Sequence, residues 1–217
     1  MKRILYVLIF SVSFITLFSQ EKDTELSHYV FPEFTQGIIL MKNGIKNEAL
    51  LNYNSSTEEM IFSDNGKMLA IGDTELEQID TVFIRGRKFI ILNNKFIELI
   101  YSSKCDLYAE HKCRVIPPGT EAGYGTTSQT SSTTSYSSIT SGGKLYDLKL
   151  PGDYKIEPYT YYWLKRNGEL NKFININQLK KLYNDKKNLI KAYVKNHDVK
   201  MDNQESIVQF VKYLETN

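Results

Sequence analysis

The chain has 217 residues, of which 27 are Lys or Arg, 25 are Asp or Glu and 3 are His. Hydrophobic residues make up 41%, and there are 15 tyrosines and 11 phenylalanines, which favours a packed, sheet-rich body with a hydrophobic core. The nearly balanced charge argues against a nucleic-acid-binding protein.

The N-terminus has the pattern of a secretory signal. A basic start, Met1–Arg3, precedes a mainly apolar run from Ile4 to Phe18, and the small residue Ser19 stands just before the expected cut. We therefore expect residues 1–19 to be removed on export. An uncleaved anchor is the alternative, because Leu17 is large for its position. Export makes the protein periplasmic, outer-membrane associated or secreted.

Export also governs how the charge and the cysteines are interpreted. Without Lys2 and Arg3, the mature chain carries as many basic as acidic residues. The first cysteine is Cys105, far from the cut, so we expect no lipid at the N-terminus. In an oxidising compartment Cys105 and Cys113 favour a disulfide, with two unlinked thiols as the alternative.

Residues 20–116 have the pattern of antiparallel strands joined by tight hairpins. Short apolar runs alternate with turns at 43–44, 64–66, 85–87 and 93–94. Several strands are apolar on both faces, which is typical of a sheet that is covered on each side or curls around its own core. We predict a sandwich or a small open barrel. A membrane-spanning barrel fits less well, because its strands need about 9–11 residues.

The middle of the chain interrupts and then resumes the strand pattern. Residues 117–143 are dominated by Gly, Ser and Thr, which predicts a flexible loop or a loosely held hairpin, either an inert linker or an arm that orders against a partner. Residues 144–175 return to strands. Lys144–Leu150 alternates in polarity, and the runs 159–164 and 169–173 flank a turn at Asn167-Gly168.

Residues 176–217 change to a period of about three and a half, which predicts a cap of two or three short helices. The helices start near Asn177, after Asp185 and at Asp202, where Glu205 stands three residues on, as in a capping box. Together these segments predict an α+β fold with an antiparallel β-rich body and a C-terminal helical cap.

Two groups of residues are candidate binding surfaces. The first is the aromatic run Tyr159, Tyr161, Tyr162 and Trp163, in which Tyr159, Tyr161 and Trp163 are the candidate binding residues. These rings suit a sugar-stacking platform, although such a run is also typical of core and edge packing. The second consists of Lys187, Lys191 and Lys195. This repeat suits contact with an acidic partner, an anionic lipid or a polysaccharide, and it is equally typical of a solvated helix face.

The sequence contains no pattern that proposes catalysis or a cofactor. The histidines His28, His111 and His197 are not at metal-ligand spacing, apart from His111 two residues before Cys113, and a disulfide would remove that thiol. No phosphate loop, dinucleotide fingerprint or nucleophile elbow is present. We therefore expect no metal, no cofactor and no catalytic residue.

Three segments carry a resemblance to a known group of proteins. The signal ending Phe18–Gln20, the strand Leu51–Asn54 and the Lys-rich tail from Gln178 to Leu214 resemble the uncharacterised exported proteins of Bacteroidetes-type bacteria. The resemblance extends over most of the chain. It implies export, and it carries over no activity and no site residue.

Three functional hypotheses follow. The first is a non-catalytic envelope protein that acts by protein–protein interaction, as an accessory subunit of an outer-membrane or periplasmic assembly. The second is a carbohydrate-binding module that uses residues 159–163, and the third is a hydrolase with a dispersed site. The expected partner is an envelope protein, with a polysaccharide or an anionic surface as alternatives and no nucleic acid.

Overall fold

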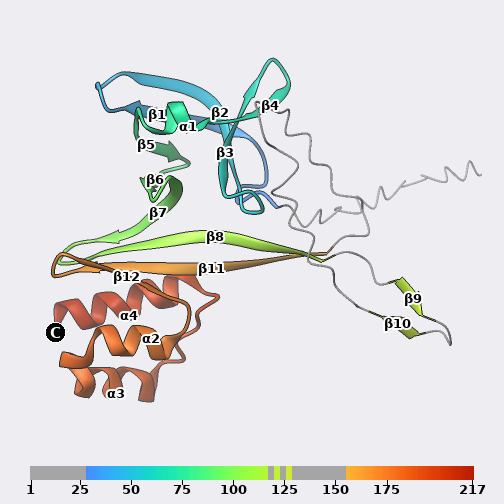
Figure 1. Cartoon of the computed structure of the whole chain (residues 1–217). Coiled ribbons are helices and arrows are strands. Elements are labelled where there is room, and N and C mark those ends of the chain that lie inside the picture. Colours follow the sequence, from blue (N-terminus) through green and yellow to red (C-terminus); the bar gives the residue numbers. More distant parts are fainter. Residues whose placement is uncertain (1–27, 117–119, 123–125, 129–154) are drawn as a thin grey trace, which may run out of the picture.

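The computed structural model describes residues 28–116, 120–122, 126–128 and 155–217 (Figure 1). Its main feature is one ten-stranded antiparallel sheet followed by C-terminal helices, which confirms the predicted α+β, β-rich fold. The predicted signal peptide and the predicted strand Lys144–Leu150 lie outside the described residues.

The sheet is built mainly from consecutive hairpins. Its strands lie in the order β12-β11-β8-β7-β6-β5-β1-β2-β3-β4. Their bounds are β1 (Thr35–Met41), β2 (Lys46–Asn54), β3 (Glu59–Asp64), β4 (Lys67–Ala70), β5 (Ile79–Ile84), β6 (Arg87–Leu92), β7 (Lys95–Ser102), β8 (Asp106–Ile116), β11 (Lys155–Arg166) and β12 (Glu169–Phe173). A separate small hairpin, β9 (Thr120–Ala122) with β10 (Thr126–Ser128), lies within the predicted loop segment 117–143.

Four of the hairpins close through two-residue turns, at the positions predicted from sequence. The pairs are Asn65-Gly66, Arg85-Gly86, Asn93-Asn94 and Asn167-Gly168, and both residues of each pair have positive φ. Such turns match the right-handed twist of the flanking strands, and Asn and Gly adopt positive φ at low cost. Arg85 does so without that advantage.

One end of the sheet curls until it nearly closes on itself, as in an open barrel. The turn after β2 contacts the part of β8 that extends beyond its pairing with β7. There the Cys113 backbone N–H donates to the Ser55 carbonyl at 3.1 Å. Glu58 in that turn also forms ion pairs with Lys95 and Lys112. The curl encloses a core formed by Phe31, Leu51, Tyr53, Met60, Ile71, Leu76, Ile79, Val82, Ile84, Phe89 and Phe96.

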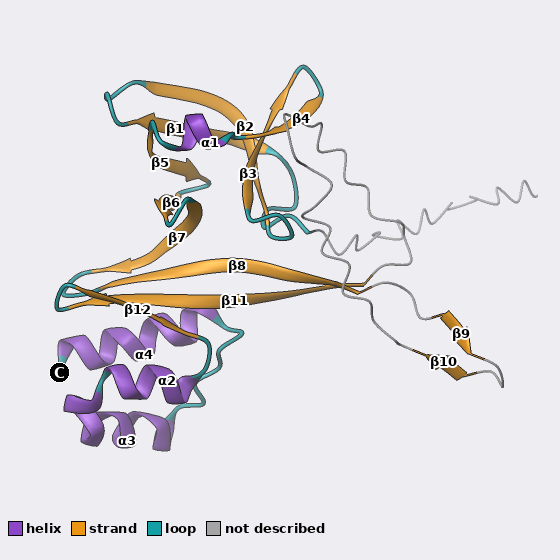
Figure 2. Cartoon of the chain, in the orientation of Figure 1, coloured by secondary structure: helices purple, strands orange, loops and turns teal. Residues whose placement is uncertain are grey.

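Helices lie against the other end of the sheet, below β11 and β12 in Figure 2. They cover the same face as the first core, because Phe89 of that core is aligned by register through Glu98 with Ala109 and Tyr162 of the core beneath the helices. The helical elements are α2 (Ile176–Leu182), a short 3-10 turn at Asn184–Lys186, α3 (Lys187–Asn196) and α4 (Gln204–Thr216). Their apolar sides form a second core with Tyr162, Leu164 and Phe173 of the sheet. Within the described residues, no helix is long and apolar enough to cross a membrane.

Two local predictions about helices need correction. The cap of α4 is Asn203 and not Asp202, because the Asn203 side-chain oxygen accepts from the Ser206 backbone N–H at 2.9 Å. The sequence pattern also missed the four-residue helix α1 (Asp73–Leu76) between β4 and β5. A helix this short has too few residues to show a periodic pattern.

The structure does not form the predicted disulfide between Cys105 and Cys113. Both cysteines are free, Cys105 just before β8 and Cys113 within it. A strand rises about 3.3 Å per residue, which separates the two by roughly 26 Å, whereas bridged Cα atoms lie within about 7 Å. Burial raises the pKa of Cys105 to about 11, so this thiol is protonated at neutral pH.

The close contact between β1 and its neighbours gives a test of the curl. A Cβ atom at Gly37 would lie 2.7 Å from Leu51 Cδ1 and 2.8 Å from the Phe83 carbonyl oxygen. Because backbone cannot yield easily, Gly37→Ala is expected to lower the free energy of unfolding by about 1–3 kcal/mol in urea titration. The control is Gly72→Ala, where the close atom belongs to the flexible Glu75 side chain. Equal losses in the two variants would contradict the packing described.

Candidate functional site

Strand β11 separates its side chains between the two faces of the sheet. Tyr162 and Leu164 point into the helical core, so the alternation of the strand places Tyr159, Tyr161 and Trp163 on the opposite face. All three are half-buried, and the rings of Tyr159 and Tyr161 meet edge to face at a centroid distance of 5.1 Å. The three aromatic residues singled out from the sequence therefore do share one surface. We call the face that carries both cores the inner face and this one the outer face.

A buried carboxylate from the neighbouring strand holds the aromatic residues in place. Glu110 of β8 lies opposite Tyr161, and its side chain is only 7% exposed. It accepts from Trp163 Nε1 and from Lys172 Nζ of β12, each at 2.8 Å. Burial alone would raise the pKa of Glu110, but the hydrogen bonds from Lys172 and Trp163 outweigh it and lower that pKa. Glu110 is therefore ionised and positioned at neutral pH.

Cations lie against the rings. Lys172 Nζ is 4.3 Å from the ring centroid of Tyr161 and 5.1 Å from that of Trp163. Lys112 Nζ is 5.9 Å from the ring of Tyr161 and 3.5 Å from Glu110. Such contacts stabilise by about 0.5–2 kcal/mol each and restrict the side chains further. We call this group the aromatic–lysine platform: Tyr159, Tyr161, Trp163, Glu110, Lys112 and Lys172.

Half of the platform was not found by sequence reasoning. Glu110, Lys112 and Lys172 come from strands on either side of β11, and only the register of the sheet brings them to its rings. A signal was nevertheless present in β8. Every second residue of this strand is polar or aromatic, namely Asp106, Tyr108, Glu110, Lys112 and Arg114. This alternation is typical of a strand with one face exposed to solvent.

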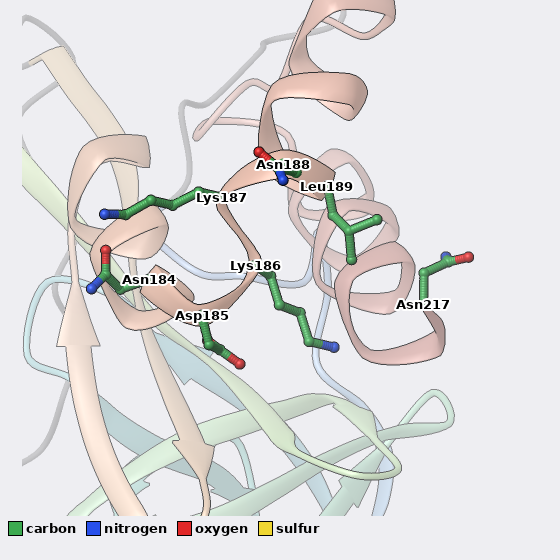
Figure 3. Close-up of a pocket in the computed structure, with 7 residues that line it drawn as sticks. All are labelled: Asn184, Asp185, Lys186, Lys187, Asn188, Leu189 and Asn217. Atoms are coloured by element: carbon green, nitrogen blue, oxygen red, sulfur yellow. The ribbon is translucent and has the colours of Figure 1, made fainter.

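The predicted lysine repeat lies elsewhere. Lys187, Lys191 and Lys195 are exposed on α3, which belongs to the helical layer on the inner face, so the structure does not bring them to the platform. A hollow of about 520 Å³ adjoins the start of α3. Figure 3 shows Lys187 pointing away from Asp185 and Lys186 there.

Two of the three charged side chains that line that hollow are engaged in contacts within the fold. Asp185 accepts from Arg166 at 2.7 Å, and Lys186 Nζ donates to the Leu214 carbonyl. Arg166 also reaches the buried Glu215 at 3.1 Å. These contacts attach the end of β11 to the helices. Asp185 and Lys186 therefore serve that attachment, and Figure 3 shows that Lys187 does not converge with them.

A second polar cluster lies on the inner face. The guanidinium of Arg87 donates two hydrogen bonds of 2.6 Å to Glu98, and His111 Nε2 lies 2.7 Å from Glu98 Oε2. Glu98 has a side chain only 4% exposed. The ring of Phe31 closes over Arg87, with its centroid 4.8 Å from Cζ. We call this group the buried ionic cluster: Arg87, Glu98 and His111.

The cluster is better suited to structure than to catalysis. His111 Nε2 lies 2.7 Å from Glu98 Oε2 and 3.0 Å from Arg87 Nη2. A carboxylate only accepts and a guanidinium only donates, so one protonation state cannot make both contacts hydrogen bonds. The shorter contact, with Glu98, is the hydrogen bond when the proton is on Nε2, and Arg87 is then a charged neighbour of the ring. That nitrogen is then unable to act as a base. Among the hydrogen bonds of the described residues, none joins the His111 ring to a hydroxyl or a thiol nucleophile. The pair of His and carboxylate alone does not make a triad.

Comparison of the chain with protein-family models, with curated proteins and with solved structures gives no match. The functional argument therefore depends on the geometry of the platform and of the outer face. In the part of the chain that the structure describes, no three His, Cys, Asp or Glu side chains are grouped as metal ligands.

The ionic cluster predicts how stability depends on pH. Burial opposes ionisation of Glu98, but hydrogen bonds from His111 and Arg87 outweigh it, so the pKa of Glu98 is lowered in the fold. The stabilisation is thus complete above the unfolded-state pKa of about 4.3 and is lost as the pH falls through the folded-state value.

Glu98→Gln tests this contribution. Near pH 7 it is expected to lower the free energy of unfolding by about 3 kcal/mol, at the low end for a broken buried pair, because Arg87 keeps some contact with water. The difference from wild type should shrink in acid, as followed by urea titration at several pH values. The control is Glu33→Gln, which breaks the exposed pair with Arg85 and should change little. A pH-independent difference for Glu98→Gln would contradict the assignment.

Proposed function

We propose that this protein is a non-catalytic exported protein that docks onto a partner protein of the cell envelope through the aromatic–lysine platform. The observation that carries the proposal is the set of half-buried aromatic rings held by a buried, ionised Glu110. Tyrosine and tryptophan are enriched at the energetic centres of protein interfaces. A platform whose side chains are already ordered loses little conformational entropy on binding.

The placement of the platform supports docking. Among the described residues, the helices α2, α3 and α4 pack against the inner face, and Tyr159, Tyr161 and Trp163 on the outer face of β11 keep part of their surface exposed. The aromatic rings contribute apolar area, while Lys112 and Lys172 contribute charge at the same place. An envelope assembly is the expected setting because the N-terminal pattern directs the chain to export.

Carbohydrate binding is the second candidate. It is favoured by the spacing of Tyr159, Tyr161 and Trp163 at every second residue of one strand, which sets the rings in a line. It ranks lower because Lys172 already lies over the rings of Tyr161 and Trp163. A sugar would have to displace that lysine, together with its ion pair to Glu110.

Affinity purification of the tagged full chain from fractionated cells tests the proposal. Trp163→Ala and Lys172→Glu are each expected to weaken recovery of the partner at least tenfold, since central interface residues contribute about 2 kcal/mol or more. The matched control replaces Lys187, Lys191 and Lys195 with Ala, which alters the opposite layer and should leave recovery unchanged. Circular dichroism checks that each variant folds.

Three outcomes would reject docking through the platform. They are recovery of the chain without any other protein in every fraction, equal partner recovery with Trp163→Ala, or loss of the partner only in the lysine control. Binding of the purified chain to a glycan array, abolished by Trp163→Ala, would instead support the carbohydrate alternative.

A further inference from the structure

A second feature of the outer face lies at the other end of the sheet, on β2, β1, β5 and β6. Glu48 is the direct register partner of Ile38, Ile38 of Phe83, and Phe83 of Lys88. Because their chain neighbours Ile39, Val82 and Phe89 belong to the inner core, the four side chains project outward. We call these four residues the outer row.

The surface around the row is unusually apolar for a face open to solvent. The described residues contain four exposed large hydrophobic side chains, and two of them lie on the outer face of the β1–β2 hairpin, Ile38 at 37% and Leu50 at 45%. A third, Ile45 at 56%, lies in the turn of the same hairpin. A sheet with one solvated face normally alternates to polar residues there. Exposed apolar groups gathered at one place are typical of an interaction surface.

The two ends of the row, Glu48 and Lys88, carry opposite charges, and neither charge forms an ion pair among the described residues. In that part of the chain, Glu48 accepts one hydrogen bond, from Gln36 at 3.3 Å. The order along the row is therefore acid, apolar, apolar, base. When a second copy of the row runs in the opposite direction, each acid faces a base and each apolar residue faces an apolar residue.

We propose that the outer row is the contact surface between two copies of this chain. A twofold axis parallel to the strands, between β1 and β5, reverses the row and sets Glu48 of one copy against Lys88 of the other. Ile38 of each copy then meets Phe83 of the other. Such an interface is isologous, so every contact forms twice.

The dimensions of a sheet are consistent with this contact. Strands lie about 4.8 Å apart, so Glu48 and Lys88 each stand roughly 7 Å from the axis, while packed sheets are about 10 Å apart. The sheet curls with its outer face convex, so the two surfaces separate away from the axis. The short apolar residues lie at the centre, and the long Glu and Lys side chains reach across where the gap widens.

Addition of a strand along the first half of β11 is a less suitable route to a dimer. Residues 155–161 of β11 extend beyond β12, but Pro158 interrupts this open edge. Its register partner Cys113 donates its N–H away from β11, to Ser55. The two residues are therefore a non-hydrogen-bonded pair, so the backbone nitrogen of Pro158 faces the open side of β11. Proline has no N–H to donate there. Proline in this position blocks edge pairing.

Sedimentation and light scattering of the full mature chain over a range of concentrations test the proposal. The wild type should be a dimer that dissociates on dilution. Glu48→Lys and Lys88→Glu should each raise the dissociation constant at least tenfold, because each creates two like-charge contacts. The double variant Glu48→Lys with Lys88→Glu should restore the dimer, since the exchanged charges again face one another.

The controls separate this surface from general charge effects. Glu75→Lys and Lys67→Glu change exposed charges outside the row and should leave the dimer intact. If a charge variant does not fold, Ile38→Gln replaces it and should also dissociate the dimer. A wild-type monomer at every concentration overturns the proposal, as does a double variant that stays monomeric. Neither result bears on the platform, which lies on β8, β11 and β12.

Discussion

The antiparallel pairing of β8 with β11 is the contact on which the rest of the structure depends. It runs from Asp106 opposite Lys165 to Ile116 opposite Lys155, over the whole of β8. At one end of the pair, the side chains pack against the helices. At the other end, the backbone of β8 forms a hydrogen bond with the turn after β2. The pairing joins segments far apart in the chain, so its closure entropy must be recovered from all the contacts that it organises.

The inner face contains two apolar cores with a polar cluster between them. Glu98 lies beside Ala109 of the core under the helices and beside Phe89 of the core enclosed by the curl. A buried ion pair adds little net stability over apolar packing, but losing one partner is costly. The buried ionic cluster therefore specifies how the two cores are aligned more than it adds to their stability.

The outer face contains the two proposed contact surfaces. The outer row continues by direct register from Lys88 through Leu99 and Tyr108 to Trp163, so the two surfaces are joined by one rigid sheet. A dimer formed through the row would present two platforms on opposite sides. If a partner assembly offers repeated sites, two linked platforms would bind it more tightly than one, without any new contact.

The sequence by itself determined the local elements. Positive-φ turns such as Asn167-Gly168 defined the hairpins, and apolar periodicity defined the helices, because both signals depend on residues close in the chain. It also placed Tyr159, Tyr161 and Trp163 on one face, since strand alternation is local. The cap of α4 was misplaced by one residue because Asp202 and Asn203 are both good caps.

Only the tertiary structure decided which elements meet. Cys105 and Cys113 suggested a bridge by their spacing, but one continuous strand through both keeps them apart. Glu110 and Lys172 joined the platform, and Glu98 met Arg87 and His111, through strand register. Register and curl are set by the sum of many weak contacts between distant segments, and no short stretch of sequence contains that sum.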